Sequence, residues 1–388
     1  MAKLFIIADD FTGALDTGVQ FAAHGAATRV VTRLDGGFAL EGVQVLVLDA
    51  ETRHLPAEEA YRVVHEAVSA AREAEVPYIY KKTDSGLRGN VGAELAAAMD
   101  ALGVEGMPFI PELPSMHRVA RGGVYYVDGV PVADSVFGRD PFEPVTSSSI
   151  GDIIARQTDK PVSVLGPGRG VPLMGIGAYD AETDEDLSRI GEELGLKGLR
   201  LSAGCAGFAA VLAGMLGLRG EPPRIPALPR SFFMVCGSIN PVTRAQVVRA
   251  AEAGFTRVWM GGVLDGPASP RMILDANRQL EDVAVLPGED RLRVSEELAS
   301  AAKGFLDRGL NATLMCVGGD TLMALMRAVG VSALTPVCEM DKGVVLTSFD
   351  YAPAGGAQRT YYIMAKSGGF GDPGLLCRLA DRLAGDIS

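Results

Sequence analysis

The sequence predicts an α/β protein of two domains, the first built around a doubly wound, mostly parallel sheet. Three observations lead to this prediction: the length of 388 residues, the alternation of strand-like and helix-like patterns, and a proline-rich break after residue 217. A chain of this length commonly forms more than one domain, and an apolar content of 48% supplies a sizeable core. Short apolar runs that alternate with amphipathic helices are typical of parallel sheets.

The first half of the chain carries this alternation most clearly. Short apolar runs predict strands at residues 4–8, 28–31, 43–49, 77–80 and 161–165. Amphipathic patterns predict helices from about Thr12 to His24, after Pro56 and near residues 183–195. Between them, residues 111–123 are predicted to form a polar loop and residues 135–149 an irregular segment. Asp128-Gly129, flanked by alternating apolar residues, predicts a two-residue hairpin.

Residues 218–230 separate the two predicted domains, 1–217 and 231–388. They contain four prolines and no apolar periodicity, so they are predicted to be a linker and a candidate hinge. Beyond the linker, strand-like runs lie at residues 231–238, 256–260, 312–320, 342–348 and 358–367. Helices are predicted from Pro241, near 290–308, at 321–329 and at 375–386. The second domain is therefore also expected to be α/β.

Composition and charge exclude several classes of function. A net charge of −12 argues against non-specific nucleic-acid binding, because few basic groups could replace the counterions of a phosphate backbone. The first apolar run is too short for a signal peptide or a membrane span, and no later run supplies such a length, so we expect a cytoplasmic protein without a membrane partner. Five scattered cysteines without CxxC spacing predict reduced core thiols, and four unclustered histidines argue against structural zinc.

Acidic residues follow the first predicted strand. Asp9 and Asp10 come directly after the apolar run, and Asp16 lies one to two turns further on. We expect Thr12 to cap the following helix while Asp10 faces solvent at the carboxyl end of the strand. The helix dipole alone would explain one acid at this place. Two in succession, with Asp16 after them, favour a functional site.

The stretch PYIYKKTDSGLRGN places more charge at a second strand end. The residues that could carry chemistry there are Lys82, Asp84, Ser85 and Arg88. An arginine can clamp a carboxylate, and Asp84 and Ser85 suit hydroxyl groups. The alternative is a surface loop that neutralises itself through an Asp–Arg pair. Because Arg53 lies at a third strand end, the groups together predict a pocket for a small, hydroxylated, anionic molecule.

The second domain carries three glycine-rich turns, each between a predicted strand and a predicted helix. They lie at Gly237-Ser238, at Gly318 to Thr321 and at Gly368 to Gly374. Free N–H groups, missing Cβ atoms and helix N-termini are the features that bind phosphate. Three such turns favour a nucleotide. The sequence contains no GxxxxGK[ST], and GPGRG at 166–170 does not match the dinucleotide fingerprint.

Six ordered motifs resemble those of the four-carbon acid sugar kinase family. They are ADDFTGALD, KKTDSGLRGN, the hairpin followed by FGRDPFEP, GSINPVT with Gln246 after it, GGDT and KSGGFG. The resemblance extends over nearly the whole chain. It implies an N-terminal acid-sugar-binding domain, a C-terminal ATP-binding domain and an active site in the cleft between them. The family acts on D-threonate, D-erythronate and 3-oxo-tetronates, and a different hydroxy acid is the alternative substrate.

The resemblance also implies roles for individual residues. The substrate contacts would come from Asp9, Asp10, Arg53, Lys82, Thr83, Asp84, Ser85 and Arg88. The ATP contacts would come from Ser238, Gly318, Gly319, Asp320, Thr321, Gly368 and Gly369. The implied cofactors are ATP and Mg²⁺, with Asp320 as the expected metal-binding carboxylate. A homodimer is the expected assembly, because it is the commonest one.

Phosphoryl transfer requires alignment, neutralisation of the γ-phosphate charge and a group that accepts the hydroxyl proton. We expect Arg88 and Arg53 to hold the substrate carboxylate while Asp10 and Asp84 hold its hydroxyls. The candidates for the proton acceptor are Asp10, Asp84 and, by analogy with ribokinase-type sugar kinases, Asp372.

Two other classes of function remain as alternatives. A nicotinamide-dependent oxidoreductase would share the doubly wound sheet, but it should carry a GxGxxG that opens a helix. A non-catalytic two-domain binding protein would not need both a pocket for a polyol acid and three phosphate-type turns.

Overall fold

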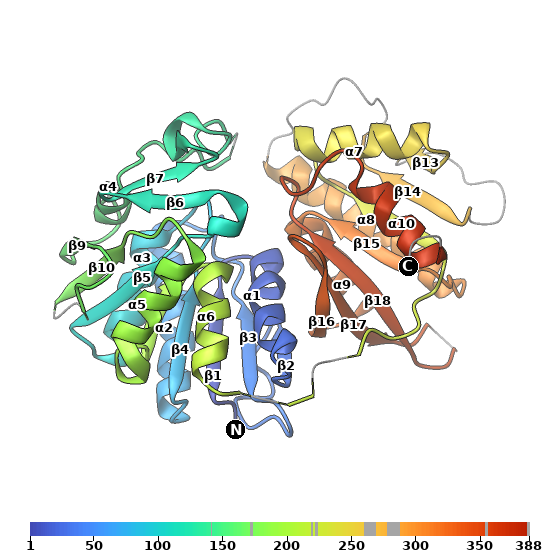
Figure 1. Ribbon diagram of the computed structural model, residues 1–388. Helices are drawn as coiled ribbons and strands as arrows, with labels where there is room; N and C mark the ends of the chain where they lie inside the picture. Colours follow the sequence, from blue (N-terminus) through green and yellow to red (C-terminus); the bar gives the residue numbers. More distant parts are fainter. Residues whose placement is uncertain are drawn as a thin grey trace. The chain divides into compact units, whose positions relative to one another are not determined.

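The computed structural model describes residues 1–140, 142–170, 174–218, 220–221, 224–259, 269–277, 288–353 and 356–385. The chain divides into two compact units, Met1–Pro222 and Pro223–Ser388 (Figure 1). This division falls within the predicted linker at 218–230. The assignment of separate binding tasks to 1–217 and 231–388 stays a prediction.

The first unit is built on a parallel sheet in the strand order β2-β3-β1-β4-β11-β5-β10-β9. The strands are β1 (Leu4–Ala8), β2 (Thr28–Val31), β3 (Val45–Asp49), β4 (Tyr78–Lys82), β5 (Gly106–Ile110), β9 (Val162–Leu165), β10 (Gly175–Tyr179) and β11 (Leu201–Gly204). Every pair of neighbours in this order is parallel. The mostly parallel first sheet is therefore confirmed.

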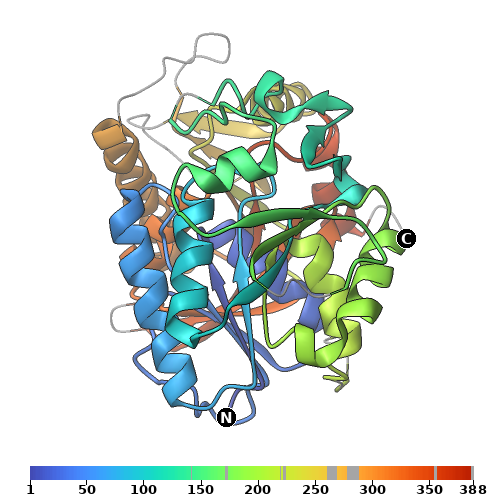
Figure 2. The ribbon, with the colours of Figure 1, turned by 90° about the vertical axis from the view of Figure 1, so that its left-hand side faces the viewer.

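Helices cover both faces of this sheet. They are α1 (Phe11–Ala23), α2 (Ala57–Glu73), α3 (Val91–Leu102), α4 (Ile150–Ala155), α5 (Asp184–Gly198) and α6 (Ala206–Met215). The helices α2 and α3 pack together on one face, and α5 and α6 pack together on the other (Figure 2). This is the doubly wound arrangement, which brings the carboxyl ends of the strands to one edge of the sheet.

A small antiparallel sheet follows β5. It consists of β6 (Arg118–Arg121), β7 (Val124–Val127) and β8 (Val130–Pro131). The predicted hairpin at Asp128-Gly129 is confirmed, with positive φ angles of 52° and 78° at its two turn residues. The prediction of a loop over all of 111–123 is wrong, because β6 pairs with β7 across a second turn at Gly122-Gly123. The arginines at both ends of β6 interrupt the alternation of apolar and polar residues by which a strand is predicted.

The second unit has a mixed sheet in the order β13-β14-β12-β15-β18-β17-β16. The strands are β12 (Phe232–Cys236), β13 (Thr256–Trp259), β14 (Arg271–Asp275), β15 (Thr313–Val317), β16 (Ala333–Asp341), β17 (Val344–Tyr351) and β18 (Arg359–Lys366). The pairs β16–β17 and β17–β18 are antiparallel. Sequence patterns did not predict β14 and β16, because a terminal arginine and Pro336 interrupt their apolar residues, and they did not predict β10 of the first unit, which glycines interrupt. They also gave no bounds for β5 and β11.

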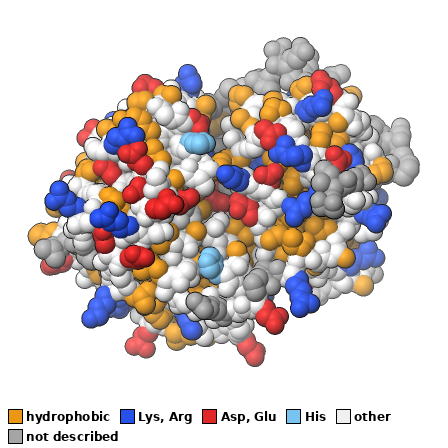
Figure 3. Space-filling view, viewed as in Figure 1, with side chains coloured by type: hydrophobic (Ala, Val, Ile, Leu, Met, Phe, Trp, Pro, Cys, Tyr) orange, Lys and Arg blue, Asp and Glu red, His pale blue; other side chains and the backbone are white. Residues whose placement is uncertain are grey.

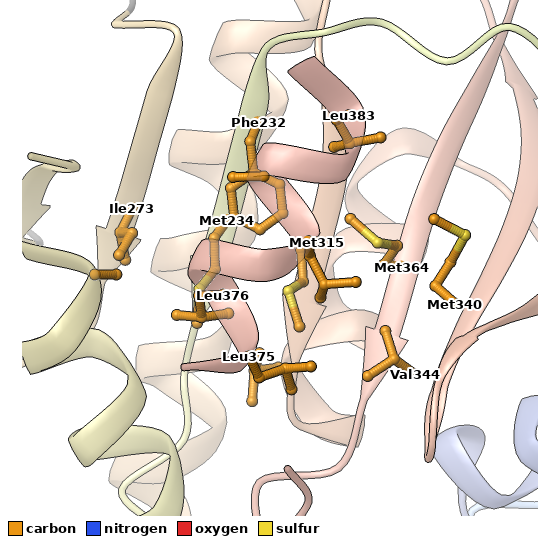
Figure 4. Packing of buried hydrophobic residues seen from close by; sticks show 14 of the residues in the cluster. Phe232, Met234, Ile273, Met315, Met340, Val344, Met364, Leu375, Leu376 and Leu383 are labelled. Carbon is orange, nitrogen blue, oxygen red and sulfur yellow. The ribbon is translucent and has the colours of Figure 1, made fainter. Parts of the chain in front are cut away.

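The described residues of this unit include the helices α7 (Pro241–Glu252), α8 (Gly288–Asp307), α9 (Gly319–Val329) and α10 (Leu375–Ala384). Leu375 and Leu376 of α10 lie beside Met234 and Met315, which come from neighbouring strands (Figure 4). All four side chains are at most 1% exposed. This packing holds α10, and with it the glycine-rich segment before α10, against the sheet.

Charged side chains of both signs are interspersed on the face of each unit that Figure 3 shows. Apolar side chains lie between them on the same face. In the part of the chain that the structure describes, no helix combines the length and the apolar character that crossing a bilayer requires.

One buried ion pair joins the sheet of the first unit to a covering helix. Lys81 Nζ lies 2.8 Å from Glu94 Oε2 of α3, and the two side chains are 0% and 2% exposed. Lys81 Nζ also donates a hydrogen bond to Lys82 O. Because successive strand residues point to opposite faces, Lys82 points the other way, toward α1. Lys81 therefore belongs to the helix–sheet interface.

We expect Lys81→Met to lower the free energy of unfolding by about 3–5 kcal/mol, because it leaves Glu94 buried without its partner. Burial already raises the pKa of Glu94, although Lys81 opposes this effect. The double variant Lys81→Met/Glu94→Leu should recover most of the loss, since it removes both buried charges. Urea denaturation followed by circular dichroism measures the effect, with Lys197→Met as the exposed control. A double variant as unstable as Lys81→Met would contradict this reading.

Candidate functional site

The carboxyl ends of β1, β3 and β4 lie side by side in the first unit. Ala8 pairs with Asp49 on one side and with Lys82 on the other. The polar residues predicted for the site follow these ends: Asp9, Asp10, Arg53, Thr83, Asp84, Ser85 and Arg88. The structure therefore brings together residues that are up to 79 positions apart in the chain.

Arg53 lies at the centre of this group and is 9% exposed. Its Nε donates to Asp9 Oδ2 at 2.7 Å, and its Nη1 donates to Asp10 Oδ2 at 2.9 Å. Its Nη2 lies 2.8 Å from Asp10 Oδ1 and 3.5 Å from Asp84 Oδ1. One guanidinium thus connects acids from two strand ends, and Arg53 itself comes from the third.

The expectation that Thr12 caps α1 and that Asp10 faces solvent is wrong. Asp10 is the N-cap: its Oδ1 accepts a hydrogen bond from Gly13 N at 2.9 Å. Thr12 Oγ1 donates to the other carboxylate oxygen at 2.7 Å. The Asp10 side chain is only 15% exposed, because Arg53 draws it into the cluster while the helix N-terminus stabilises its charge.

Asp84 and Arg88 form a bidentate pair within the same loop. Arg88 Nε and Nη2 donate to the two carboxylate oxygens at 2.8 and 3.0 Å. The backbone N–H groups of Gly86 and Arg88 also donate to Asp84 Oδ2. The remaining side of the Arg88 guanidinium donates through Nη1 to Asp140 Oδ2 at 2.9 Å. The predicted Asp–Arg pair therefore exists inside a larger buried network.

These cations keep the carboxylates ionised. Burial raises the pKa of Asp10, but Arg53 and Lys82 outweigh burial and hold this pKa below the usual range. Burial acts in the same way on Asp84, and Arg88 and Arg53 hold its pKa well below the usual range. Both acids therefore carry a negative charge at neutral pH.

Lys82 differs from the two arginines in its partners. Its ammonium donates to Thr83 O at 2.6 Å, and the side chain is 3% exposed. Among the described residues, no carboxylate oxygen lies within 4.0 Å of Lys82 Nζ in an ion pair. A Cβ atom at Gly13 would lie 2.8 Å from Nζ and 2.5 Å from Asp10 Oδ1, so glycine leaves the room that both groups occupy.

Thr83 and Ser85 are held by neighbouring segments. Thr83 N donates to Gly204 O at 2.9 Å, and its side chain is 1% exposed. Ser85 Oγ accepts a hydrogen bond from Arg118 Nη1 of β6, and Tyr125 Oη lies within hydrogen-bond distance of Ser85 O. The small antiparallel sheet thereby fixes the loop that carries Asp84.

Sequence reasoning assigned no role to three residues that complete this site: Arg118, Phe137 and Asp140. The guanidinium carbons of Arg88 and Arg118 each lie 5.1 Å from the centre of the Phe137 ring, a cation–π distance. A Cβ at Gly86 would collide with that ring at 2.5 Å. Phe137 and Asp140, from the segment predicted to be irregular, therefore contact the 84–88 loop. The motif FGRDPFEP contained this information, but no spacing rule pointed to it.

The three glycine-rich turns of the second unit meet at the carboxyl ends of β12, β15 and β18. A Cβ at Gly237 would collide with Thr321 Oγ1, and a Cβ at Gly368 would collide with Ser238 Oγ. Gly318 N donates to Lys366 O at 3.0 Å. The predicted turns are thus in mutual contact. Gly319 and Asp320 lie in the first turn of α9, which has no side chain hydrogen-bonded as a cap at its N-terminus.

Asp372 lies in the third turn and pairs with an arginine of α10. Arg378 Nη1 and Nη2 donate to its two oxygens at 2.8 and 2.6 Å, and Gly374 N donates to Oδ1. Arg378 lowers the pKa of Asp372 to about 2. The side chain is 56% exposed, in contrast to the buried acids of the first unit.

A metal site made only of protein side chains is not present among the described residues: no group of three or more His, Cys, Asp or Glu could hold an ion. Asp320, at the N-terminus of α9, offers one hard oxygen donor beside the glycine turns. Mg²⁺ is commonly held by one or two carboxylates together with phosphate oxygens and water. Asp320 fits that mode.

Known proteins resemble the chain over both units. A family model described as a sugar-binding N-terminal domain matches residues 4–168, and one described as a nucleotide-binding C-terminal domain matches residues 268–376. A D-threonate kinase of Bordetella bronchiseptica is 30% identical, covering 97% of this chain and 96% of its own. A D-erythronate kinase of Heliobacterium modesticaldum is 28% identical, covering 100% and 98%.

Two solved structures match with similar coverage. A Salmonella typhimurium protein described as a putative tRNA synthase has a TM-score of 0.77 at 21% identity, covering 98% of this chain and 99% of its own, a likeness of fold alone. A domain-swapped dimer from Bordetella bronchiseptica with bound citrate has a TM-score of 0.51 at 26% identity, covering 98% of each chain. Because a relative 30% identical aligns with nearly the whole chain, and the two domain models match in order, the chain belongs to the four-carbon acid sugar kinase family.

Proposed function

We propose that the chain transfers the γ-phosphoryl group of ATP to a hydroxyl of a small sugar acid such as threonate, erythronate or a 3-oxo-tetronate. The observation that carries this proposal is the pairing of two different sites in one chain. The first unit has a buried set of charged groups suited to a hydroxylated anion, and the second has three glycine turns in contact. Family membership supports both assignments.

The partners of the cations in the first unit favour Lys82 as a partner of the substrate carboxylate. Arg53 and Arg88 already face four carboxylates, those of Asp9, Asp10, Asp84 and Asp140. The ammonium of Lys82 has three donors, and one of them is used by Thr83 O. A carboxylate from the substrate would therefore accept hydrogen bonds from the remaining donors of Lys82. Arg88 can join it, since Asp140 is the more exposed of its two partners.

The ionised acids suit the hydroxyl groups of the same substrate. A carboxylate accepts hydrogen bonds from hydroxyls. Asp10 and Asp84 already accept from backbone N–H groups, from Thr12 and from the arginines, so a substrate hydroxyl would share or replace one of these donors. Asp10 and Asp84 both contact the Nη2 atom of Arg53, at 2.8 and 3.5 Å. We propose that they orient the hydroxyl that receives the phosphoryl group.

The second unit would bind ATP through the backbone of its glycine turns. Ser238, Gly318 to Thr321, Gly368 and Gly369 are the proposed contacts, because N–H groups at helix N-termini and in glycine turns attract phosphate. Asp320 would contribute one oxygen to Mg²⁺, which neutralises phosphate charge when bound. The residues of the glycine turns would orient the phosphates and exclude water from them.

A homodimer is part of the same proposal. The related structure from Bordetella bronchiseptica is a domain-swapped dimer. Closed two-fold assemblies are the commonest homo-oligomers. Gel filtration with light scattering gives the mass directly.

The proposed function predicts that the purified protein converts ATP to ADP with Mg²⁺ only when a suitable acid is present. The panel is D- and L-threonate, D- and L-erythronate, 3-oxo-tetronates, glycerate and longer aldonates. Stimulation by one tetronate stereoisomer is the expected result, since the acids and cations of the first unit are fixed in space. ADP binding without stimulation by any acid would move the acceptor outside the panel. Absence of nucleotide binding, or turnover with a nicotinamide cofactor, would overturn the kinase proposal.

Lys82→Met should raise the KM for the acid by about 10- to 100-fold and leave the KM for ATP nearly unchanged. A hydrogen bond between two charged groups contributes about 1.5–3 kcal/mol, which corresponds to this range. The exposed Lys197→Met serves as the matched control. Initial rates with each substrate varied in turn give both constants. Equal changes in the two KM values would show that Lys82 does not hold the carboxylate.

The proton acceptor is tested by Asp10→Asn, Asp84→Asn and Asp372→Asn. The variant that removes it should lower kcat by about 10²- to 10⁴-fold while ADP still binds. Because the pKa values of all three acids are lowered, the wild-type acceptor stays ionised as the pH falls from about 8 to 5. We therefore expect kcat to stay level over that range. A decline of kcat with an apparent pKa above about 6 would exclude all three acids.

A further inference from the structure

The segment after β18 turns its carbonyl groups inward. Three side chains donate to them: Lys366 to Ser367 O and Phe370 O, Thr243 to Gly368 O, and Gln246 to Phe370 O and Asp372 O. These bonds measure between 2.7 and 3.1 Å. Within this loop Phe370 N donates to Ser367 O, whereas the N–H groups of Gly368 and Gly369 donate to no acceptor among the described residues. This is the arrangement of a backbone anion site.

Lys366 is the centre of this arrangement and is 1% exposed. Its Nζ lies 2.9 Å from Ser367 O, 2.9 Å from Phe370 O, 3.5 Å from Gly368 O and 3.4 Å from Thr243 Oγ1. Its backbone O accepts from Gly318 N at 3.0 Å. Lys366 therefore links the KSGGFG turn to the VGGDT turn, and no other described side chain contacts as many acceptors of the loop.

The charge of Lys366 has no carboxylate partner within ion-pair distance in the described parts of the second unit. On the flanking strands, its neighbours in register are Val317 and Val344. β12 contributes the buried thiol of Cys236, whose pKa burial raises to about 12. Burial lowers the pKa of Lys366 itself to about 8. The ammonium is stabilised mainly by peptide dipoles.

Other charged groups of the surrounding elements have partners of their own. On α7 and β14, Arg244 pairs with Asp275, which also binds Arg257 of β13. In the loop, the Asp372 side chain pairs with Arg378 of α10. Along α7, Thr243 and Gln246 present uncharged groups to the loop. The acids near Lys366 are thus matched by arginines.

We propose that Lys366 is a positioning residue that holds the N–H groups of Gly368 and Gly369 toward the nucleotide phosphates, which in turn complete its buried charge. This inference rests on the proposed place of the phosphates at the glycine turns. A role for Lys366 has a consequence that phosphate binding by the glycine turns alone would not have. Nucleotide binding should be linked to the protonation of one lysine.

The sign of this linkage follows from the charges. As the pH rises through about 8, the free protein loses the proton of Lys366, whereas bound phosphates favour the charged ammonium and raise its pKa. Above that pH the protein must take up a proton when it binds nucleotide. The affinity should therefore fall by up to about tenfold for each pH unit, until the pH passes the pKa of the bound state.

Calorimetric titration of the full chain with ADP tests the proposal without any turnover. It is done from about pH 7 to 9.5, in pairs of buffers that differ in ionisation enthalpy, so that proton uptake is measured directly. For the wild type we expect an affinity that falls at least about tenfold over this range, with close to one proton taken up near its upper end. Unchanged affinity and no proton uptake would overturn the proposal.

Variants separate the lysine from the rest of the loop. Lys366→Arg keeps the charge over the whole range, so it should bind ADP without proton uptake and with a flat pH profile. Lys366→Met should bind ADP at least about tenfold more weakly at every pH below 8, with no uptake. The exposed Lys342→Met, in the turn between β16 and β17, should behave as the wild type. If the Lys366 variants do not fold, the wild-type titration alone still decides the question.

A further variant distinguishes failure of this inference from failure of the proposed phosphate site. A Cβ at Gly369 would have no protein atom nearer than 3.6 Å, so Gly369→Ala should fold but place a methyl group on the face of the loop. Weakened ADP binding in Gly369→Ala together with a flat wild-type pH profile would keep the phosphate site and remove the role of Lys366. Unchanged ADP binding in both Gly369→Ala and Lys366→Met would remove the phosphate site itself.

Discussion

The first unit depends on the buried guanidinium of Arg53. Three acids contact it, Asp9 and Asp10 from the end of β1 and Asp84 from the loop after β4, while Arg53 itself follows β3. Three carboxylates placed this close would repel one another by several kcal/mol in a protein interior without a cation between them. With Arg53 present, the pKa values of Asp10 and Asp84 lie below the usual range although both carboxylates are buried. The cation therefore keeps buried acids ionised where burial alone would produce neutral acids.

The nucleotide-binding second unit places few charged side chains at its glycine turns, although a nucleotide phosphate is highly charged. Its glycine turns meet because the missing Cβ atoms at Gly237 and Gly368 admit Thr321 and Ser238. Hydrogen bonds from Lys366, Thr243 and Gln246 then fix the carbonyls of the last turn. A neutral backbone surface binds phosphate through many weak donors, which requires that each peptide be oriented before the ligand arrives. The difference between the units is a difference between orientation by ion pairs and orientation by peptide geometry.

Sequence patterns predicted the elements whose side chains alternate or repeat cleanly. The strands β1, β2, β4 and β12 are short, apolar and bounded by polar residues, and the rules for parallel sheets then locate the site at their carboxyl ends. The patterns failed where a polar residue or a proline interrupts the apolar alternation of a strand. In β6 this residue is Arg118, which contacts Ser85, and in β16 it is Pro336. The patterns also misplaced the cap of α1, since Thr12 and Asp10 are both good N-caps and only the tertiary contact with Arg53 decides between them. Contacts such as Phe137 over Gly86 join segments some fifty residues apart, and no local rule contains them.

Three buried lysines at strand ends show why residue type and position did not suffice to assign roles. Lys81 and Lys82 are adjacent, yet Lys81 pairs with Glu94, whereas Lys82 donates to a backbone carbonyl and acts on Asp10 and Asp84 from beyond ion-pair distance. Lys366, at the end of β18, has carbonyls and a hydroxyl. A buried ammonium that the protein itself neutralises stabilises the fold and needs nothing more. An ammonium left to peptide dipoles carries a desolvation cost that an anion can relieve, and the free energy of that relief contributes to binding. Lys81 therefore differs from Lys82 and Lys366 in its partner: a carboxylate of the protein neutralises Lys81, whereas a ligand is proposed to neutralise the other two.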